Sequence, residues 1–492
     1  MYQMKKTTWL DFGLLAALVA AVAFFNYVWI TTETRPPHWD MGRHLWTSLI
    51  YLDNLYHFRH IYRLWTDYYF YPPFRHWVTI PFYLVFGKTL AVAVGSNLFF
   101  VAVLAFSMYG IGRELWNRTT GLLAALFILA SPYYVSQFKE YMMDAPLGSM
   151  VALSLFLLLK TENFSNKGNS RWLGFSMGLG MLTKWNFAPC MVVPLIYVLV
   201  QGWKKDPSGK NGERSNILWA LVIASGVSLL WYANHPRMLR EDLVISSLET
   251  GKPPFFNWDA QWFYFWVLEK NQLFLVPFLM FLGGLFWSAF SRRVWDKNKI
   301  LVLFVLGNYF LFNLIHRDLR YTMPMMVGVS ALAVFWIGEI GAAWARNMAV
   351  VLTVAYCAFA FWAVSFGTAL IPQQWTLGPL VLFSQQGCML GAPSRENWHQ
   401  DEAVKFVAGE PAGDREMTFK GMDTLYFNYW GLYYFSRLYG VNFKPFDDQA
   451  AYLLWREKTA PPVPKGYLLI KRFDLPDSSV LELFKRHGIP TK

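Results

Sequence analysis

The segment TRPPHWDMGRH, residues 34–44, presents a carboxylate, two histidines and two arginines directly after a long apolar run. Asp40 is a candidate general base, because a positioned carboxylate can take the proton of a hydroxyl group. His38 and His44 are more typical of packing or hydrogen bonding than of metal binding, and we expect His44 to support an acceptor. An alternative for Asp40 is the N-cap of a helix that begins near Gly42.

Three further segments, QFKEYMMDAPL, MLTKWN and HRDLRYTMP, hold charged residues among Trp, Tyr, Phe and Met. Charged groups near membrane depth are costly, which makes them functional candidates. Lys and Arg can bind a phosphate and stabilise it as it leaves, so three cations are candidate phosphate ligands. The candidate residues of these segments are Asp144 as a second catalytic carboxylate, Lys184, Arg317 and Arg320 for a donor phosphate, and Glu140 and Tyr321 for acceptor support.

Each of these residues also has a structural interpretation. Asp144 precedes Pro146 at the start of an apolar block and is compatible with a helix cap. Lys184 is compatible with a side chain that snorkels to the membrane interface, and the two arginines with interface anchors. A divalent metal at Asp40 has little support, because no second carboxylate stands beside it. We therefore expect no cofactor and no metal.

The composition places these residues in a membrane protein. Of 492 residues, 55% are hydrophobic, 19% aromatic and 15% charged. The apolar residues come in blocks of about 17–25, the length of a helix that crosses a bilayer. An all-α polytopic membrane protein is expected, with eleven spans at 9–30, 90–111, 120–138, 144–160, 172–183, 186–201, 216–233, 273–290, 299–315, 322–340 and 347–371.

Two of these assignments have alternatives. The pair 172–183 and 186–201 could be one long helix, which would invert everything after it, and the first span could be a signal peptide. No clear small-residue cleavage site follows the first apolar run, so we expect a retained helix. With eleven spans and a cytoplasmic N-terminus, Lys and Arg gather in the inner loops, as the positive-inside rule requires. This topology predicts a multi-pass protein of the inner or plasma membrane.

Net charge and cysteines exclude other classes. The net charge is +12, but it lies mainly in the membrane-embedded part, and no nucleic-acid-binding motif accompanies it. Such charge sets topology, so we expect membrane lipids as neighbours and no nucleic acid. The three cysteines, Cys190, Cys357 and Cys388, form neither a disulfide framework nor a metal-ligand spacing.

The predicted organisation is a transmembrane module, residues 1–375, and an extracytoplasmic soluble domain, residues 376–492, of mixed α/β structure. Outer loops are expected at 31–89 and 234–272. Leucines recur at helical spacing from Leu45, which predicts an amphipathic helix along the membrane surface. In the tail, NWHQDEAVKFVA predicts a helix and GYLLIKRF a strand. SSVLELFKRHG predicts a second helix, opened by a capping box and ended by glycine.

On the outer face of a membrane, where nucleotide sugars are absent, a sugar donor must arrive with the membrane itself. A polyprenyl-phosphate-linked sugar meets this condition. Its transfer requires a carboxylate to take the acceptor's proton and cations to stabilise the departing phosphate. The predicted outer loops bring this set of residue types to one side of the membrane.

The ordered series of motifs resembles the GT-C membrane glycosyltransferases, in particular glycosyltransferase family 39, related to protein O-mannosyltransferases and lipid A aminoarabinose transferases. The resemblance covers about 30–340. It consists of an Asp after the first span, YPPF at 71–74, GREL at 112–115, SPYYVSQFKEYMMDAPL at 131–147, GLGMLTK at 178–184 and RYTMP at 320–324. It implies an inverting transfer with Asp40 as the catalytic base, Asp144 as the second family Asp, and Lys184 and Arg320 at the phosphate. The family often has Glu after the first Asp, whereas this chain has Met41.

The sequence therefore predicts an integral-membrane glycosyltransferase that moves a sugar from a polyprenyl-phosphate donor to an acceptor hydroxyl on a protein, a lipid or a glycan. Two other classes stay open. A lipid-linked saccharide transporter, or flippase, would need the cations but no base. A non-catalytic assembly subunit would tolerate loss of Asp40.

Overall fold

The computed structural model describes residues 9–56, 62–66, 71–209, 212–236, 258–314, 317–387, 390–445, 447 and 449–488. The chain forms two compact units. Unit 1 comprises Met1–Trp29, Tyr62–Val78 and Val94–Ala392, and unit 2 comprises Ile30–Ile61, Thr79–Ala93 and Pro393–Lys492. Each unit is thus assembled from segments that lie far apart in the sequence.

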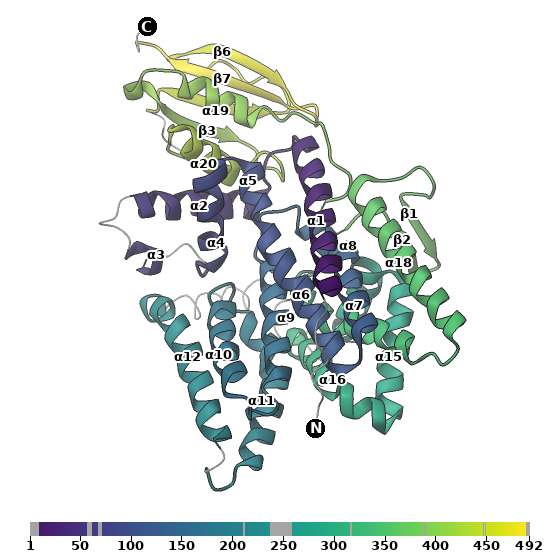
Figure 1. Cartoon of the computed structure of the whole chain (residues 1–492). Helices are drawn as coiled ribbons and strands as arrows, with labels where there is room; N and C mark the ends of the chain where they lie inside the picture. Colours follow the sequence, from purple (N-terminus) through teal and green to yellow (C-terminus); the bar gives the residue numbers. More distant parts are fainter. Residues whose placement is uncertain are drawn as a thin grey trace. The chain divides into compact units, whose positions relative to one another are not determined.

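Unit 1 is mainly helical (Figure 1). Its long helices are α1 (Trp9–Thr32), α6 (Asn97–Leu115), α7 (Arg118–Ala130), α9 (Asp144–Lys160), α10 (Lys167–Met181), α11 (Phe187–Lys205), α12 (Glu213–Asn234), α14 (Trp258–Val267), α15 (Leu275–Phe290), α16 (Arg292–Asn313) and α18 (Ala343–Phe366). Its short elements are α3 (Arg63–Thr66), α8 (Pro132–Gln137), the π-helix η2 (Leu268–Leu273), η3 (Met323–Met325), α17 (Met326–Val334), η4 (Phe335–Glu339) and the hairpin strands β1 (Gln374–Leu377) and β2 (Leu380–Ser384). Three helices, α1, α4 (Phe74–Phe86) and α5 (Leu90–Gly95), contribute to both units.

Small residues allow the helices of unit 1 to pack closely. At Gly174 on α10, an added Cβ atom would lie 2.3 Å from the backbone oxygen of Ala220 on α12. Glycine at this position therefore permits the contact of these two helices, as small residues do wherever helices pack in membranes. The separate α10 and α11 also confirm the predicted break between 172–183 and 186–201, because α10 ends at Met181 and α11 begins at Phe187.

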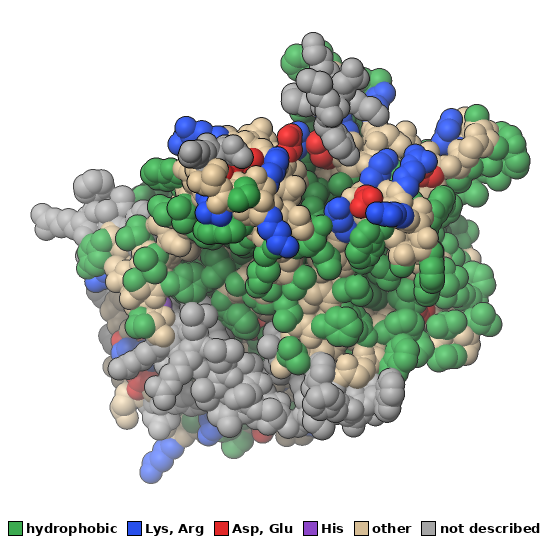
Figure 2. All heavy atoms as spheres, turned by 90° about the horizontal axis from the view of Figure 1, so that it is seen from below, with side chains coloured by type: hydrophobic (Ala, Val, Ile, Leu, Met, Phe, Trp, Pro, Cys, Tyr) green, Lys and Arg blue, Asp and Glu red, His purple; other side chains and the backbone are tan. Residues whose placement is uncertain are grey.

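The described residues contain five helical segments long and apolar enough to cross a membrane: Trp9–Thr32, Leu90–Leu115, Phe187–Lys205, Glu213–Asn234 and Ala343–Phe366. Each of the eleven predicted spans falls on a helix or on consecutive helices of this fold. The mostly helical architecture is confirmed, whereas eleven spans and the sidedness of the loops stay predictions. Figure 2 shows a face on which Lys and Arg side chains gather between hydrophobic ones, as expected for the ends of membrane helices.

Unit 2 contains the helix α2 (Trp39–Tyr56), where the amphipathic helix was expected. It also holds a five-stranded sheet with the strand order β4-β3-β5-β7-β6, in which β3 is parallel to β4 and β5, and β7 is antiparallel to β5 and β6. The elements of the tail are α19 (Gln400–Ala408), η5 (Ala412–Asp414), β3 (Glu416–Gly421), α20 (Tyr429–Tyr439), β4 (Asn442–Phe443), β5 (Tyr452–Glu457), β6 (Tyr467–Asp474) and β7 (Val480–Arg486). The helix predicted in 397–408, the strand predicted in 466–473 and the small sheet domain are confirmed, as α19, β6 and the five-stranded sheet.

The predicted helix in SSVLELFKRHG is wrong, because this segment forms the strand β7. The Ser479 hydroxyl donates to the Asp477 carboxylate, at 2.6 Å, instead of capping a helix. Val480–Arg486 pairs with neighbours on both sides, β5 and β6, and Leu481 and Leu483 are fully buried. Pairing and burial in the sheet outweigh the local capping signal, as tertiary context often does.

The N-cap alternative for Asp40 is also wrong, since α2 begins at Trp39 and Asp40 lies within its first turn. Gly42 on this turn meets α20: an added Cβ atom would lie 2.8 Å from the backbone carbonyl carbon of Trp430. Arg43 lies over the Trp430 ring, 5.1 Å from its centroid. The helix α2 is therefore fixed on α20 within unit 2. Most of the predicted loop 234–272, together with His316 and Cys388, lies outside the described residues.

Candidate active site

A buried ion pair forms the centre of the candidate site in unit 1. Lys184, in the turn between α10 and α11, donates from Nζ to Oδ1 of Asp144 at 2.8 Å. Both side chains are almost fully buried, with exposed fractions of 5% and 2%. Asp144 lies in the first turn of α9, where the helix dipole favours a negative charge. The pairing excludes the snorkelling interpretation of Lys184, because its ammonium group ends on a buried carboxylate.

Two aromatic rings enclose the ammonium group of Lys184. Its Nζ lies 5.5 Å from the ring centroid of Tyr71 and 5.3 Å from that of Tyr321. Cation–π contacts of this length stabilise a cation that has lost its water. Tyr71 belongs to the YPPF motif and Tyr321 to the RYTMP motif, so two motifs of the resemblance meet at this lysine.

A second ion pair lies in the loop before η3. Arg320 donates from Nε to Oδ1 of Asp318 and from Nη2 to Oδ2, both at 3.2 Å, and its backbone NH donates to Oδ1 at 2.8 Å. Both side chains are partly buried, with exposed fractions of 21% and 25%. Arg317, which is 8% exposed, directly precedes this pair. The loop thus presents two guanidinium groups with one carboxylate between them in sequence.

The π-helix η2 anchors this loop. The Gln272 amide donates to the backbone oxygen of Leu319 at 3.1 Å and to Oγ1 of Thr322 at 3.2 Å. Gln272 and Thr322 are fully buried. π-helical turns often occur at functional sites, and here one supplies the amide that fixes the backbone around Arg320.

The Asp144 carboxylate keeps Lys184 protonated at neutral pH. Burial lowers the pKa of Lys184, but the Asp144 carboxylate outweighs burial and holds that pKa above the ordinary value of 10.5. Burial raises the pKa of Asp318, but Arg320 lowers it further, to below 3.8. Burial raises the pKa of Tyr321 to about 12, so its hydroxyl is a neutral donor. Lys184 and Arg320 thus present two cations beside two carboxylates, Asp144 and Asp318.

The loop that leads into Asp144 is held by a buried amide on α6. Asn97 donates from Nδ2 to the backbone oxygens of Phe138 and Glu140, at 2.9 and 2.8 Å. Its Oδ1 accepts from Nη2 of Arg75 at 2.8 Å, and Arg75 lies over the Tyr141 ring, 4.0 Å from its centroid. Arg75 and Asn97 are almost fully buried. They therefore fix the chain directly before the catalytic candidate Asp144.

Glu140, proposed from the sequence as acceptor support, is fully buried in this loop. Its Oε2 accepts from the Gln137 amide at 3.2 Å. The structure therefore places its carboxylate in the core of unit 1, next to the loop that Asn97 holds.

The remaining candidates belong to unit 2. Asp40 is exposed at the start of α2, whereas His44, one turn later, is 3% exposed and buried in that unit. His38 is buried as well. The exposed carboxylate of Asp40 is accessible to a substrate, which a general base requires. Within the described ranges, no group of three or more His, Cys, Asp or Glu side chains is arranged to hold a metal ion.

An apolar cavity of about 340 Å³ adjoins the turn that carries Lys184. It is formed by α10, α11 and α16, and Met181 and Phe187 in its wall stand three residues before and after Lys184. The lining is Met177, Met181, Phe187, Ala188, Pro189, Met191, Val192, Leu195 and Leu311. An apolar cavity beside a buried cation suits a lipid whose head is an anion.

Six of the predicted residues lie in unit 1, namely Glu140, Asp144, Lys184, Arg317, Arg320 and Tyr321. Of these, Lys184 contacts Asp144 and the ring of Tyr321. Asp40 and His44 lie in unit 2. Tyr71 and Asp318 were missed as individual residues, although both stand in segments noted for their aromatic or charged character, YPPF and HRDLR. Gln272, Arg75 and Asn97 had no signal in the sequence, because they act through backbone groups of distant segments.

Comparison with known proteins identifies the fold. Residues 71–231 match the family model described as dolichyl-phosphate-mannose-protein mannosyltransferase. Among curated proteins, the lipopolysaccharide core galacturonosyltransferase RgtA of Rhizobium johnstonii is 26% identical over 185 residues, which are 36% of this chain and 35% of that protein. The match thus spans about a third of the length of this relative.

Solved structures resemble nearly the whole chain. ArnT from Cupriavidus metallidurans in the apo state has a TM-score of 0.60 at 12% identity, with 95% of this chain and 97% of that chain covered. The same protein bound to undecaprenyl phosphate has a TM-score of 0.56 at 13% identity and the same coverage. The matched proteins are GT-C glycosyltransferases, and the resemblance seen in the sequence is confirmed.

Proposed function

We propose that this chain, a relative of the GT-C glycosyltransferases in sequence and fold, transfers a sugar from a polyprenyl-phosphate donor to an acceptor hydroxyl at the outer face of the membrane. The observation that carries the proposal is the buried Lys184–Asp144 pair, enclosed by Tyr71 and Tyr321 and adjoined by an apolar cavity. A cation of this kind binds the phosphate, and the cavity takes the first isoprene units.

Charge supports a phosphate diester as the donor. A polyprenyl-phosphate sugar carries one negative charge, which Lys184 and Arg320 can bind in competition with Asp144 and Asp318. Asp144 holds Lys184 in place before the donor arrives. The similarity to a protein that has been seen with undecaprenyl phosphate also supports this donor class.

In the proposed step, Asp40 takes the proton of the acceptor hydroxyl. The acceptor oxygen forms a bond to the anomeric carbon of the sugar on the face opposite the phosphate. The bond between that carbon and the phosphate oxygen breaks, its electron pair stays on the phosphate, and the configuration is inverted. Lys184 and Arg320 stabilise the phosphate that leaves. The proposed step uses no metal or other cofactor.

The test uses the full-length protein in nanodiscs with a polyprenyl-phosphate sugar and membrane extract, and measures released polyprenyl phosphate. Asp40→Asn is expected to lower turnover at least a hundredfold, within the range that general base catalysis contributes, and to leave donor binding unchanged. Asp474→Asn is the matched control, because Asp474 on β6 is an exposed carboxylate of the same unit and lines neither cavity. Wild-type turnover in Asp40→Asn would contradict the base and favour a transporter or an assembly subunit.

A further inference from the structure

A second cavity, of about 540 Å³, lies entirely within unit 2, and we call it the unit-2 pocket. Four parts of the chain form it: residues 33–36 after α1, residues 88–90 at the start of α5, residues 397–405 leading into α19, and α20. Its volume falls within the range of about 300–1,000 Å³ that is usual for small-molecule sites. None of the residues assigned to catalysis or to the donor phosphate lines it, so the proposed step leaves it unexplained.

The lining combines aromatic rings with hydrogen-bonding side chains. Trp398, Tyr434 and Tyr439 provide rings, and Asn397 and Gln400 provide amides. Rings of this kind pack against the C–H faces of sugars, while amides and hydroxyls bond to sugar hydroxyls. A lining for an acyl chain would lack the amides and the charged groups.

The acidic and basic residues of the lining all have ion-pair partners. Lys88 pairs with Asp53, which lies outside the lining, at 3.8 Å, and the other four pair with each other. Arg35 makes two hydrogen bonds to the Glu33 carboxylate, at 2.8 and 2.6 Å. Lys405 donates to Asp401 at 2.8 Å. Because Glu33 and Asp401 stand among the cations, a strongly anionic ligand would meet repulsion here. A pocket in which positive and negative side chains are paired in this way suits a neutral ligand with many hydroxyl groups.

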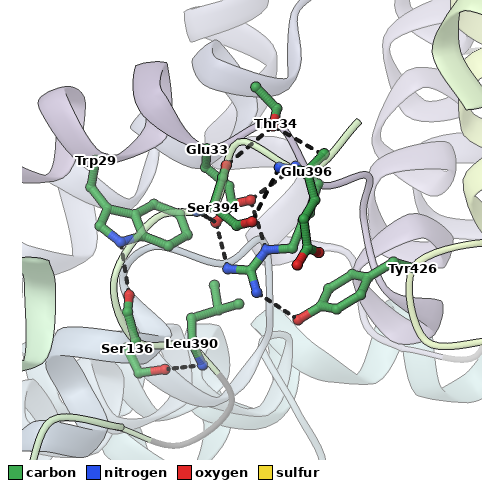
Figure 3. Close-up of polar contacts among 10 residues, drawn as sticks. Trp29, Glu33, Thr34, Ser136, Leu390, Ser394, Glu396 and Tyr426 are labelled. Carbon is green, nitrogen blue, oxygen red and sulfur yellow. Dashed lines mark hydrogen bonds and ion pairs between the residues drawn. The ribbon is translucent and has the colours of Figure 1, made fainter. Parts of the chain in front are cut away.

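The wall of the pocket is fixed before a ligand binds. Thr34 donates from Oγ1 to the backbone oxygens of Ser394 and Glu396, at 3.1 and 3.0 Å (Figure 3). The Glu33 carboxylate accepts from the backbone NH of Ser394 at 3.2 Å, and Arg35 donates to the Tyr426 hydroxyl at 3.1 Å. Preformed sites lose less conformational entropy on binding.

The wall also carries buried polar atoms that lack partners. In the part of the chain that the structure describes, Nε1 of Trp398 and Oε1 of Gln400 have no hydrogen-bond partner. Both side chains are more than nine-tenths buried. Such atoms are uncommon in folded proteins and call for an explanation. Both atoms are closed off from solvent, so a ligand hydroxyl bonds to them only after the side chains turn toward it.

We propose that the unit-2 pocket binds the saccharide part of the acceptor. This inference rests on the proposed glycosyl transfer and adds the chemical class of its acceptor. Helix α20 lines the pocket through Tyr434 and Tyr439 and also packs on α2, where Arg437 bonds to Asp53 at 2.6 Å. The pocket and the base Asp40 therefore share one rigid frame within unit 2, so that binding in the pocket orients the acceptor to the base.

The test measures binding of a defined probe, the core oligosaccharide released from lipopolysaccharide by mild acid, to the full-length protein in nanodiscs without donor. Saturation-transfer NMR gives the dissociation constant. Lys405→Gln and Tyr439→Phe are expected to raise it at least fivefold. Lys444→Gln is the matched control, because the Lys444–Glu416 pair, at 2.7 Å, is similarly exposed but lies outside the pocket. It should bind like the wild type.

Three outcomes would overturn the inference: no saturable binding by the wild type, equal constants in Lys405→Gln and Lys444→Gln, or competition by a serine- and threonine-rich peptide that binds more tightly than the oligosaccharide. Donor turnover is measured in parallel. If the wild type turns over the donor and Lys405→Gln has the same kinetic constants, the pocket does not bind the acceptor, but the proposed transferase function stands. Oligosaccharide binding without any transfer would refute the proposed function and, with it, the assignment of the saccharide as acceptor.

Discussion

At the residue scale, Lys184 has two partners that compete for its charge. Without donor, Asp144 neutralises it inside unit 1. A bound phosphate would share the same ammonium group. Burying two charges is costly unless they are paired, and removing one partner of a buried pair leaves the other uncompensated, at a cost of about 3–5 kcal/mol. The site is therefore stable when empty and has a cation ready for the donor.

This competition predicts that removing Asp144 and removing Lys184 change the stabilisation by polyprenyl phosphate in opposite directions. In Asp144→Asn, Lys184 is left without its carboxylate, so the melting temperature falls, and polyprenyl phosphate is expected to raise it by more than in the wild type. In Lys184→Met, the melting temperature also falls, but polyprenyl phosphate should no longer raise it. Thermal unfolding in detergent with and without polyprenyl phosphate measures both shifts.

Lys160→Met is the control, because Lys160 pairs with Glu114 in the same unit, at 3.2 Å and away from the cavity. It should keep the wild-type response to the lipid. Because the folded pKa of Lys184 is raised, the stability from the pair is complete below 10.5 and is lost only as the pH rises through the higher folded value. A full lipid response in Lys184→Met would contradict its role at the phosphate.

At the scale of elements, the site depends on how loops are tied to helices. Asn97 on α6 donates to two backbone oxygens of the loop before α9, and Arg75 orients its amide. An unpaired buried carbonyl costs about 1–3 kcal/mol. Such bonds do not touch a substrate, but they set where the first turn of α9 begins and hence where Asp144 lies.

Loss of the Asn97 amide is therefore expected to lower kcat about tenfold or more and to change the donor KM little. Asn97→Ala removes both bonds, and Asn97→Gln should restore part of the rate if its longer amide reaches the loop. Steady-state kinetics separate the two constants. Asn216→Ala is the matched control, since Asn216 donates to the oxygen of Phe164 in the loop at the other end of α9, at 2.8 Å. An equal loss of kcat in both variants would indicate general destabilisation instead of positioning.

The sequence predicted most elements but few of their connections. Apolar blocks of membrane length predicted the helices well, and 144–160 coincides with α9, because burial along a long helix leaves a strong periodic or continuous signal. The local sequence pattern could not predict the strand β7, because its conformation depends on pairing with β5 and β6. The pairing of Asp144 with Lys184, 40 residues apart, and the anchoring by Asn97 and Gln272 depend on tertiary contacts that no local pattern encodes.

At the scale of the whole molecule, the proposed reaction needs residues from both units. The phosphate-binding cations belong to unit 1, and Asp40 and the unit-2 pocket belong to unit 2. A general base must come within hydrogen-bonding reach of the acceptor hydroxyl. The reacting groups must therefore meet in the complex with donor.

If Asp40 is the base of the proposed reaction, it must come within reach of Tyr71, whose ring contacts Lys184, when the donor is bound. In a variant without the three native cysteines, Asp40→Cys combined with Tyr71→Cys is expected to be joined by a crosslinker of about 10 Å, a span that leaves room for one sugar, and more completely with polyprenyl phosphate present. Mass spectrometry of the digested protein measures the crosslinked fraction. Asp53→Cys combined with Tyr71→Cys is the control, because Asp53 lies more than three turns further along α2. If the pair with Asp53→Cys is crosslinked with and without lipid and the pair with Asp40→Cys is not, Asp40 lies away from the phosphate site. That result would contradict the proposed transfer.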